Sequence, residues 1–420
     1  MKKLFIITTL AVVCAGVSAQ EEKKAETGYG FTTVDSLAIT PVKDQASSGT
    51  CWSFSSIGFF ESELLRLGKG EHDLAEMFVV HKTMEDRAKA AVRLHGDIEF
   101  AQGGSFYDVV YCWKNYGMVP QEVMPGIMYK SDHINHTELT AVAKAYVDAL
   151  AKSNLKKLTD VWQKGFSGIY DAYIGECPEK FTYNGKEYTP KSYAESLGLN
   201  MDDYVSLTSF THHPFYEQFI IEIQDNWRWG LSYNLPLDEF MAVMHNAIKN
   251  GYTFAWGADV SEPGFTRDKN ALCVIPADDK DNKYLREPGD EKEITQEMRQ
   301  EGYDNWETTD DHGMQIFGIA KDKNGKEYFM VKNSWNTTAG HNGIWYASDA
   351  YVALKTINIL VHKDALPKDI KKKLGIKSTR VNFPHKKETF TQRLFFYFIL
   401  YLCILEQTGL FRGPKTSTYE

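Results

Sequence analysis

Four side chains in this sequence have the types and spacing that nucleophilic thiol chemistry needs: Gln45, Cys51, His312 and Asn333. Such chemistry requires an ionisable cysteine, an imidazole that exchanges its proton, a group that orients the imidazole, and donors for an oxyanion. Cys51 opens a predicted helix, whose unpaired N–H groups and dipole lower a thiol pKa. Gln45 precedes it by a short, turn-rich stretch and can donate an amide N–H to an oxyanion. We therefore predict Cys51 as the nucleophile.

The imidazole and the amide that would orient it lie in one segment, DDHGMQIFGIAKDKNGKEYFMVKNSW, whose pattern predicts a β-hairpin. A loop over 321–325 places His312 opposite the residue that follows Asn333, whereas a two-residue Asn-Gly turn would oppose it to Thr337. We favour the longer loop, because the side-chain oxygen of Asn333 could then accept from the ring and fix its tautomer. The Trp335 ring would cover His312 and Asn333 and exclude water from them.

The elements that must position these residues follow from hydrophobic periodicity. After Cys51, apolar side chains recur at three- and four-residue steps, and Gly68 marks the end of that helix. Further helices are predicted over about 74–94 and 105–116. From Tyr252 the pattern changes to strands separated by turn signals. Helices first and strands later predict an α+β fold.

Both ends of the chain differ from its predicted folded domain. Residues 1–19 combine a short basic start, an apolar stretch and small residues, which is typical of a secretory signal peptide, so we expect an exported protein, periplasmic or secreted. Residues 20–39 are predicted as a leader, and 378–420 as an atypical tail. The domain itself spans 40–377, with a helical insertion at about 130–229. Neither terminal apolar stretch reaches the ~20 residues of a spanning helix, so no membrane span is expected in the mature chain.

The amino-acid composition indicates a folded protein and argues against a nucleic-acid-binding function. The 420 residues are 43% hydrophobic and 25% charged, as in ordinary folded proteins, and 47 basic against 56 acidic residues argue against nucleic acid as a partner. Six cysteines, one of them in the signal peptide, are too few for a disulfide scaffold, and the odd number that remains leaves a thiol unpaired within the chain.

Neither His212-His213 nor the pair His81 and Glu85 has a third ligand with matching spacing, so no metal site and no cofactor is predicted.

The segments PVKDQASSGTCWSF, DDHGMQ and VKNSWN resemble the three signature blocks of papain-like cysteine peptidases. The blocks LAEMFVVHKTMEDRA, QGGSFYDVVYCWKNYGMVP and GIWYASDAYV make the chain most similar to the bleomycin hydrolase and aminopeptidase C group. This resemblance extends over about 40–361. It implies a papain-like fold of a helical lobe and a β-rich lobe, and an enzyme that removes residues from peptide N-termini. It also implies a homo-oligomer, commonly a hexamer, with the C-terminus of the chain in the cleft.

Carried over residue by residue, the resemblance implies that Gln45 is the oxyanion donor, Cys51 the nucleophile, His312 the base and acid, and Asn333 the group that orients the imidazole. Gly103-Gly104 would offer its backbone to the substrate. Paired glycines are also common in turns, so the purely structural interpretation of this pair stays open. No metal or organic cofactor takes part in this chemistry.

Three features depart from the family pattern. Ser48 stands where secreted papain-like enzymes usually have a cysteine, which favours the aminopeptidase branch. Most members of that group are cytosolic, whereas this chain has an export signal. The chain also continues past 375–377, where the family's terminus should lie, so an endopeptidase is the first alternative to an exported cysteine aminopeptidase. A non-catalytic peptide-binding module is the second, and the complete set of catalytic residues argues against it.

Overall fold

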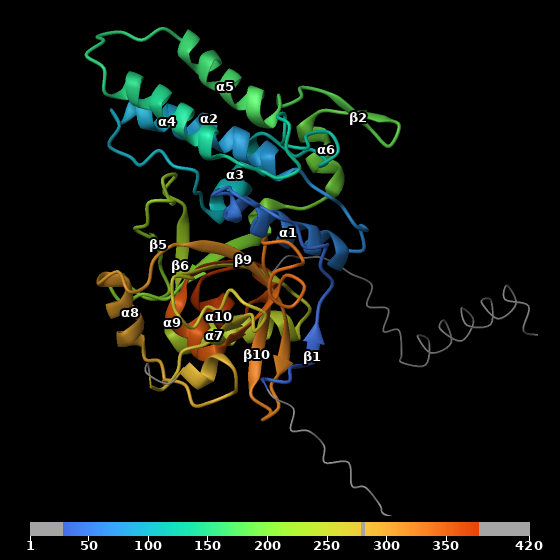
Figure 1. Cartoon of the computed structure of the whole chain (residues 1–420), viewed down its shortest axis with the longest axis vertical. Helices are drawn as coiled ribbons and strands as arrows, with labels where there is room; N and C mark the ends of the chain where they lie inside the picture. Colours follow the sequence, from blue (N-terminus) through green and yellow to red (C-terminus); the bar gives the residue numbers. More distant parts are fainter. Residues whose placement is uncertain (1–27, 279–281, 378–420) are drawn as a thin grey trace, which may run out of the picture. The chain divides into compact units, whose positions relative to one another are not determined.

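The computed structural model describes residues 28–278 and 282–377, in which a helical lobe packs on a β-rich lobe (Figure 1). The predicted signal peptide and the predicted tail, 378–420, lie outside these residues. Among the described residues, no helix is long and apolar enough to cross a membrane. The cysteines in this part of the chain are all free thiols: Cys51, Cys112, Cys177 and Cys273.

The first three helices lie where the hydrophobic pattern predicts them. α1 (Cys51–Arg66) begins at the predicted nucleophile and ends just before Gly68, which has a φ of 69° that favours glycine. α3 (Phe106–Asn115) starts with a capping box between Ser105 and Asp108. The other helices are α2 (Glu76–Arg93), α4 (Thr137–Ala151), α5 (Val161–Ile174), α6 (Pro190–Leu197), α7 (Leu237–Lys249), α8 (Gln296–Asp304), α9 (Asp349–Lys355) and α10 (Lys368–Lys373).

One ten-stranded sheet forms the β-rich lobe, with the order β5-β6-β4-β12-β7-β9-β10-β11-β8 and β1 paired to β9. Its strands are β1 (Thr32–Ser36), β4 (Tyr204–Thr208), β5 (Gln218–Ile220), β6 (Leu231–Asn234), β7 (Phe254–Ala258), β8 (Leu272–Cys273), β9 (His312–Lys321), β10 (Glu327–Lys332), β11 (Ile344–Ser348) and β12 (Thr356–His362). Helices together with a mixed sheet confirm the predicted α+β class. β1 lies inside the predicted leader 20–39, so the folded part begins earlier than that boundary.

The predicted helical insertion at about 130–229 divides into two structurally different parts. Its first part holds α4, α5 and α6, and the hairpin of β2 (Phe181–Tyr183) and β3 (Lys186–Tyr188) turns at Asn184 and Gly185, as the sequence predicts. α4 and α5 pack against each other and against α2 (Figure 1). Its second part, from β4 onward, belongs to the main sheet, because β4 pairs with β12 and buries Leu207 completely. The helical region therefore ends at Leu197.

α1 lies between the two lobes and is buried on nearly every side, in contact with α2 and α3 on one face and with β7 and β9 on the other. Glycines permit the close approach to the sheet. A Cβ on Gly58 would lie 3.2 Å from Gln315 Oε1, and a Cβ on Gly313 would lie 2.6 Å from Ser55 Oγ. Because Gly313 directly follows His312, this contact brings the start of β9 against the start of α1.

β9 and β10 form the predicted hairpin, but its register differs from the predicted one. The loop covers 322–326, and Lys321 pairs with Glu327. Farther along, Gln315 pairs with Lys332. Continued toward the site, this register opposes His312 to residue 335, one position beyond the expected partner.

A bulge in β9 partly offsets the shift that the loop introduces, since the pairing at the loop alone would oppose His312 to residue 336. The pairing shifts by one residue between Met330 and Val331, which leaves Phe317 as the extra residue of β9. The Phe317 carbonyl instead accepts from the backbone N–H of Leu37, at 2.9 Å, just after β1. The register of the hairpin therefore depends on a strand from the other end of the domain.

Candidate active site

Cys51 is the first residue of α1, and two backbone N–H groups favour its thiolate, those of Gly313 and Trp52. Burial is the larger influence and raises the pKa of the Cys51 thiol to about 12, with a further increase from the negative charges of Asp310 and Asp225. In the site without a substrate, the thiol is therefore protonated as long as the neighbouring imidazole is neutral.

His312 is the first residue of β9 and is 5% exposed. Its Nε2 lies 2.8 Å from Asn333 Oδ1, and this oxygen also accepts from the backbone N–H of Ser334, at 2.7 Å. Because Oδ1 can only accept, Nε2 carries the proton, and Nδ1 is the ring nitrogen left to exchange a proton with a thiol. The Trp335 ring lies 4.9 Å from the imidazole, centroid to centroid, with an interplanar angle of 31°.

The imidazole of His312 is neutral in the site without a substrate. Burial lowers its pKa to about 4; the hydrogen bond to Asn333 opposes this effect, and the charge of Arg267 adds to it. Cys51 and His312 line the same pocket. Separate ionisation of either group is unfavourable, so the route to a thiolate is the transfer of the thiol proton to the imidazole, which creates two opposite charges side by side.

Gln45 is held near α1 by hydrogen bonds at both ends of its amide. Its Nε2 donates to the Ser48 carbonyl at 2.8 Å, and its Oε1 accepts from Ser334 Oγ at 2.5 Å. Its backbone N–H donates to the Ser334 carbonyl at 2.8 Å. The segment before the nucleophile is thereby tied to the residue that follows Asn333, and Nε2 of Gln45 has a second N–H besides the one that it donates to Ser48.

The predicted glycine pair lies beside Cys51, and each glycine is needed by its surroundings. A Cβ on Gly104 would lie 2.7 Å from the Trp52 ring. A Cβ on Gly103 would lie 1.9 Å from Asp225 Oδ2, and the Gly103 carbonyl accepts from Arg87 Nη1 at 2.5 Å. Gly104 lines the pocket with the nucleophile, whereas the Gly103 carbonyl already has a partner.

We call the pocket that Cys51 and His312 line the Cys51 pocket, and it contains three carboxylates for which the sequence predicts no role. They are Asp225, Asp310 and Asp311. The adjacent pair directly precedes His312 in the DDHG segment, and that was the one available signal. The complete lining consists of Cys51, Trp52, Gly104, Ser105, Phe106, Ile223, Asp225, Gly257, Asp310, Asp311, His312, Gly313 and Asn358.

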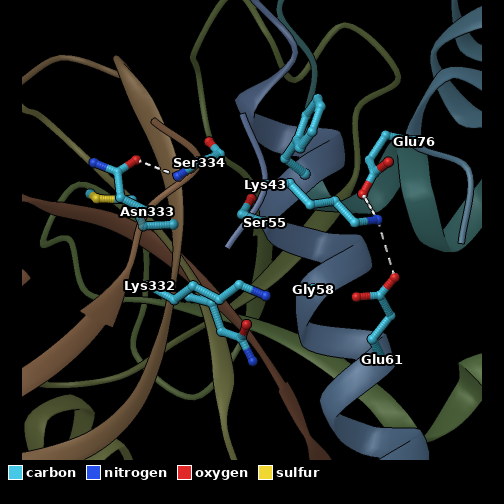
Figure 2. Close-up of a pocket in the computed structure, with 12 residues that line it drawn as sticks. Lys43, Ser55, Gly58, Glu61, Glu76, Lys332, Asn333 and Ser334 are labelled. Carbon is cyan, nitrogen blue, oxygen red and sulfur yellow. Dashed lines mark hydrogen bonds and ion pairs between the residues drawn. The ribbon is translucent and has the colours of Figure 1, made fainter. Parts of the chain in front are cut away.

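A second pocket, which we call the Lys332 pocket, lies along α1 (Figure 2). It shares Gly313 with the first. Lys43 Nζ binds Glu76 at 2.6 Å and Glu61 at 3.4 Å. Glu61 also accepts from the Leu74 N–H at 2.9 Å. Lys332 Nζ donates to Thr40 Oγ1 at 3.0 Å, and the Thr40 hydroxyl donates in turn to Glu61. Sequence patterns alone gave no indication of this buried network.

The structure supplies the third ligand that His212-His213 lacks in sequence. Glu222 Oε2 lies 3.1 Å from His212 Nε2, and Glu222 Oε1 lies 3.0 Å from His213 Nε2. This partly exposed group is the one cluster of potential metal ligands found among residues 28–278 and 282–377. None of its members lines the Cys51 pocket.

Comparisons with known proteins show which family the chain belongs to. The family described as the Peptidase C1-like family matches residues 74–383, a range that contains His312 and Asn333 and begins after Cys51. Aminopeptidase C from Listeria monocytogenes is 25% identical, covering 80% of this chain and 82% of the relative, and aminopeptidase C from Streptococcus thermophilus is 24% identical, covering 82% and 85%.

Among solved structures, PepW from Lactobacillus rhamnosis HN001 matches with a TM-score of 0.64 at 20% identity, covering 82% of this chain and 84% of that one. At this identity the match concerns the fold. The papain-like fold predicted from the sequence is confirmed, as is the resemblance to the aminopeptidase C group.

Proposed function

The chain belongs to the Peptidase C1-like family of cysteine-type peptidases, and from that premise we propose that it is a cysteine aminopeptidase with Cys51 as its nucleophile. The observation that carries the proposal is the Cys51 pocket, in which a thiol at a helix N-terminus and a buried imidazole bound to an amide oxygen face the same space. The aminopeptidase relatives support the substrate class, a peptide with a free N-terminus.

The reaction begins with transfer of the Cys51 proton to Nδ1 of His312. The resulting thiolate attacks the carbonyl carbon of the first peptide bond and forms a carbon–sulfur bond, while the carbonyl oxygen becomes an oxyanion. The backbone N–H of Cys51 and the amide of Gln45 are the donors for that oxyanion. The imidazolium then gives its proton to the leaving nitrogen, which departs as a free amine and leaves a thioester on Cys51.

Water completes the cycle. The imidazole of His312, neutral again, takes a proton from water as the hydroxide attacks the thioester carbonyl. The second tetrahedral species collapses and the carbon–sulfur bond breaks, which releases the amino acid. The imidazolium returns its proton to the departing sulfur, so that Cys51 is a thiol and His312 is neutral again. Asn333 keeps Nε2 protonated through both halves, so Nδ1 alone exchanges protons, and Trp335 shields this hydrogen bond from water.

Product analysis tests the proposal directly. Incubation with a peptide of about ten residues should release free N-terminal amino acids one at a time, detectable by mass spectrometry. Acetylation of the same peptide at its N-terminus should stop the release. Internal fragments from both peptides would instead support the endopeptidase alternative. An epoxide thiol inhibitor should label Cys51 stoichiometrically, and failure of both labelling and hydrolysis would leave a non-catalytic peptide-binding module.

Export and assembly extend the proposal. We propose that residues 1–19 are a cleavable signal peptide, so the mature chain in its native compartment should start near Gln20, which intact-mass measurement can decide. We also propose a homo-oligomer, a hexamer by family resemblance, which size-exclusion chromatography with light scattering can count. A mass equal to that of the uncleaved precursor would contradict the signal peptide, and a monomer would contradict the homo-oligomer. Neither result would affect the catalytic proposal.

A further inference from the structure

The loop between β5 and β6 forms one wall of the Cys51 pocket through Ile223 and Asp225. Asp225 projects from this loop onto the glycine pair, so that its Oδ2 occupies the space where a Cβ of Gly103 would be. Asp225 therefore lies against the glycine pair and faces the same pocket as Cys51.

The loop is fixed in place by polar contacts on both sides of Asp225. The buried side chain of Asn226 donates to the carbonyls of Ile221 and Gly230 at 3.1 and 3.0 Å and accepts from the Gly230 N–H at 2.8 Å. Arg228 Nε donates to Asp108 at 2.7 Å. These bonds hold the carboxylate of Asp225 in one position without a substrate, as a preorganised binding group requires.

The carboxylates in the pocket have few partners within the described chain. Arg87 Nη1 lies 3.5 Å from Asp225 Oδ1, but this guanidinium is fully buried and also donates to the carbonyls of Gly103 and Glu99. Asp310 has no hydrogen bond or ion pair with any of the described residues. Burial, and after it the charges of Asp225 and Asp311, raise the pKa of the Asp310 carboxyl to about 8. An added cation would stabilise the ionised form of this group.

The substrate of the proposed aminopeptidase carries such a cation, because the α-amino group of a peptide is protonated up to a pKa of about 7.7–8.0 and offers N–H donors to carboxylates. We propose that Asp225, together with Asp310, binds the N-terminal ammonium of the substrate in the Cys51 pocket. This inference rests on the proposed function and deepens it. It assigns the selection of free N-termini to an internal loop, independent of where the chain ends.

An ammonium group bound in the pocket would also make the Cys51 thiolate easier to form. The negative charge of Asp225 disfavours the Cys51 thiolate in the empty site, and Asp310 adds to this effect where it is ionised. A bound ammonium neutralises these charges, so a substrate with a free N-terminus makes proton transfer from Cys51 to His312 easier than a blocked substrate does. The same carboxylates would therefore bind the correct substrate and suppress the thiolate until it arrives.

The test compares matched substrates in single variants of the full chain. Aminoacyl coumarylamides with a free amine and with an N-acetylated amine are measured for the wild type, Asp225→Asn and Asp310→Asn. The wild type should prefer the free amine by at least about 100-fold in kcat/KM, and each variant should reduce this preference by about tenfold or more, the scale expected for a lost charged hydrogen bond. Hydrolysis of the acetylated substrate should stay equal or increase.

A matched control and a binding measurement keep the outcomes distinct. Glu222→Gln removes a carboxylate from the same loop, but one that faces His212 and His213, and it should keep the wild-type preference. In Cys51→Ala protein, calorimetry with a tripeptide amide and its N-acetyl form should show tighter binding of the free amine, and adding Asp225→Asn or Asp310→Asn should reduce the difference.

Equal loss of activity on both substrates, or an unchanged preference in both variants, would overturn the ammonium site while leaving the aminopeptidase intact. If Asp225→Asn does not fold, Asp310→Asn alone decides, since Asp310 has no ion pair to lose among the described residues. A wild type that hydrolyses no substrate would instead contradict the proposed function. The calorimetric comparison would then still decide whether the two carboxylates select a free N-terminus.

Discussion

The Cys51 pocket and the Lys332 pocket lie along the same helix and share Gly313, yet they differ in whether their charged side chains have partners within the chain. In the Lys332 pocket, Lys43 pairs with both Glu61 and Glu76. Glu61, 1% exposed, accepts from three donors in the described structure. In the Cys51 pocket, Asp310 has no partner among the described residues.

Buried charged groups with partners in the chain serve stability, whereas those without partners can serve ligand binding. A buried ion that is fully bonded within the chain holds elements together and has nothing left to offer a ligand. A partly buried ion without a partner costs folding free energy and is retained where a ligand completes it. Changes in the Cys51 pocket should therefore affect turnover with little effect on stability, and changes in the Lys332 pocket should do the reverse.

The largest effect is expected at the nucleophile. Cys51→Ala should lower kcat/KM by about 10³-fold or more, because the reaction then has no thiolate and only binding and the oxyanion donors remain. The free energy of unfolding should change little, since the side chain is only partly buried. Urea unfolding and hydrolysis of an aminoacyl coumarylamide measure both. Cys177→Ala, a thiol outside the pocket, is the control and should retain activity. Residual hydrolysis at the wild-type rate in Cys51→Ala would remove the proposed mechanism.

A smaller loss of turnover is expected at the orienting amide. Asn333→Ala removes the acceptor for His312 Nε2, so the ring can rotate and adopt the wrong tautomer. The misplaced imidazole should lower kcat/KM by about 10²-fold. Asn324→Ala, an exposed asparagine at the other end of the hairpin, should have no effect. Steady-state kinetics decide between them, and equal kinetics for both variants would show that the hydrogen bond does not contribute.

The third prediction moves to the Lys332 pocket, where stability should respond. Glu61→Gln leaves Lys43 with a weakened partner and should lower the free energy of unfolding by about 3 kcal/mol, the lower end for a buried ion pair that loses one member. Activity of the folded variant should remain. Glu71→Gln is the exposed control. If Glu61→Gln lost turnover but kept its stability, the division between the two pockets would be wrong.

Local signals in the sequence were enough to predict much of this site. The helix that begins at Cys51 follows from apolar spacing, and the blocks around His312 and Asn333 led to a hairpin that joins imidazole and amide. The register of that hairpin was predicted incorrectly by one position, because the loop covers 322–326 instead of 321–325, and the bulge at Phe317, which contacts the segment after β1, offsets only one of the two positions. Pairing between distant strands leaves no mark in a short sequence window.

Residues whose role depends on distant neighbours could not be found in this way. Asp225 lies in a loop without periodicity, and its importance appears only when the fold brings it against Gly103 and near Asp310, from two other segments. Lys332 follows an apolar strand and looks like its solvent-facing end, yet it is 8% exposed beside α1. A sequence pattern reports the faces of one element, whereas both pockets are made where several elements meet.

The smallest effect, a pH dependence of stability, is expected at Lys332. Burial lowers the pKa of its ammonium from 10.5 to about 8. Below pH 8 both folded and unfolded chains keep the proton, and folding must bury a charge. Between about pH 8 and 10.5 the unfolded chain binds more protons at this position than the folded chain, so the contribution of Lys332 to stability rises with pH.

Lys332→Met should remove that rise, so that the difference in unfolding free energy, wild type minus variant, increases between pH 7 and pH 10. Urea unfolding at both pH values measures it, and other titrating groups cancel in the difference. The exposed Lys69→Met variant should follow the wild type at both pH values. Parallel curves for wild type and Lys332→Met would mean that this amine is solvated in the folded protein, and the Lys332 pocket would then no longer be the structural counterpart of the Cys51 pocket.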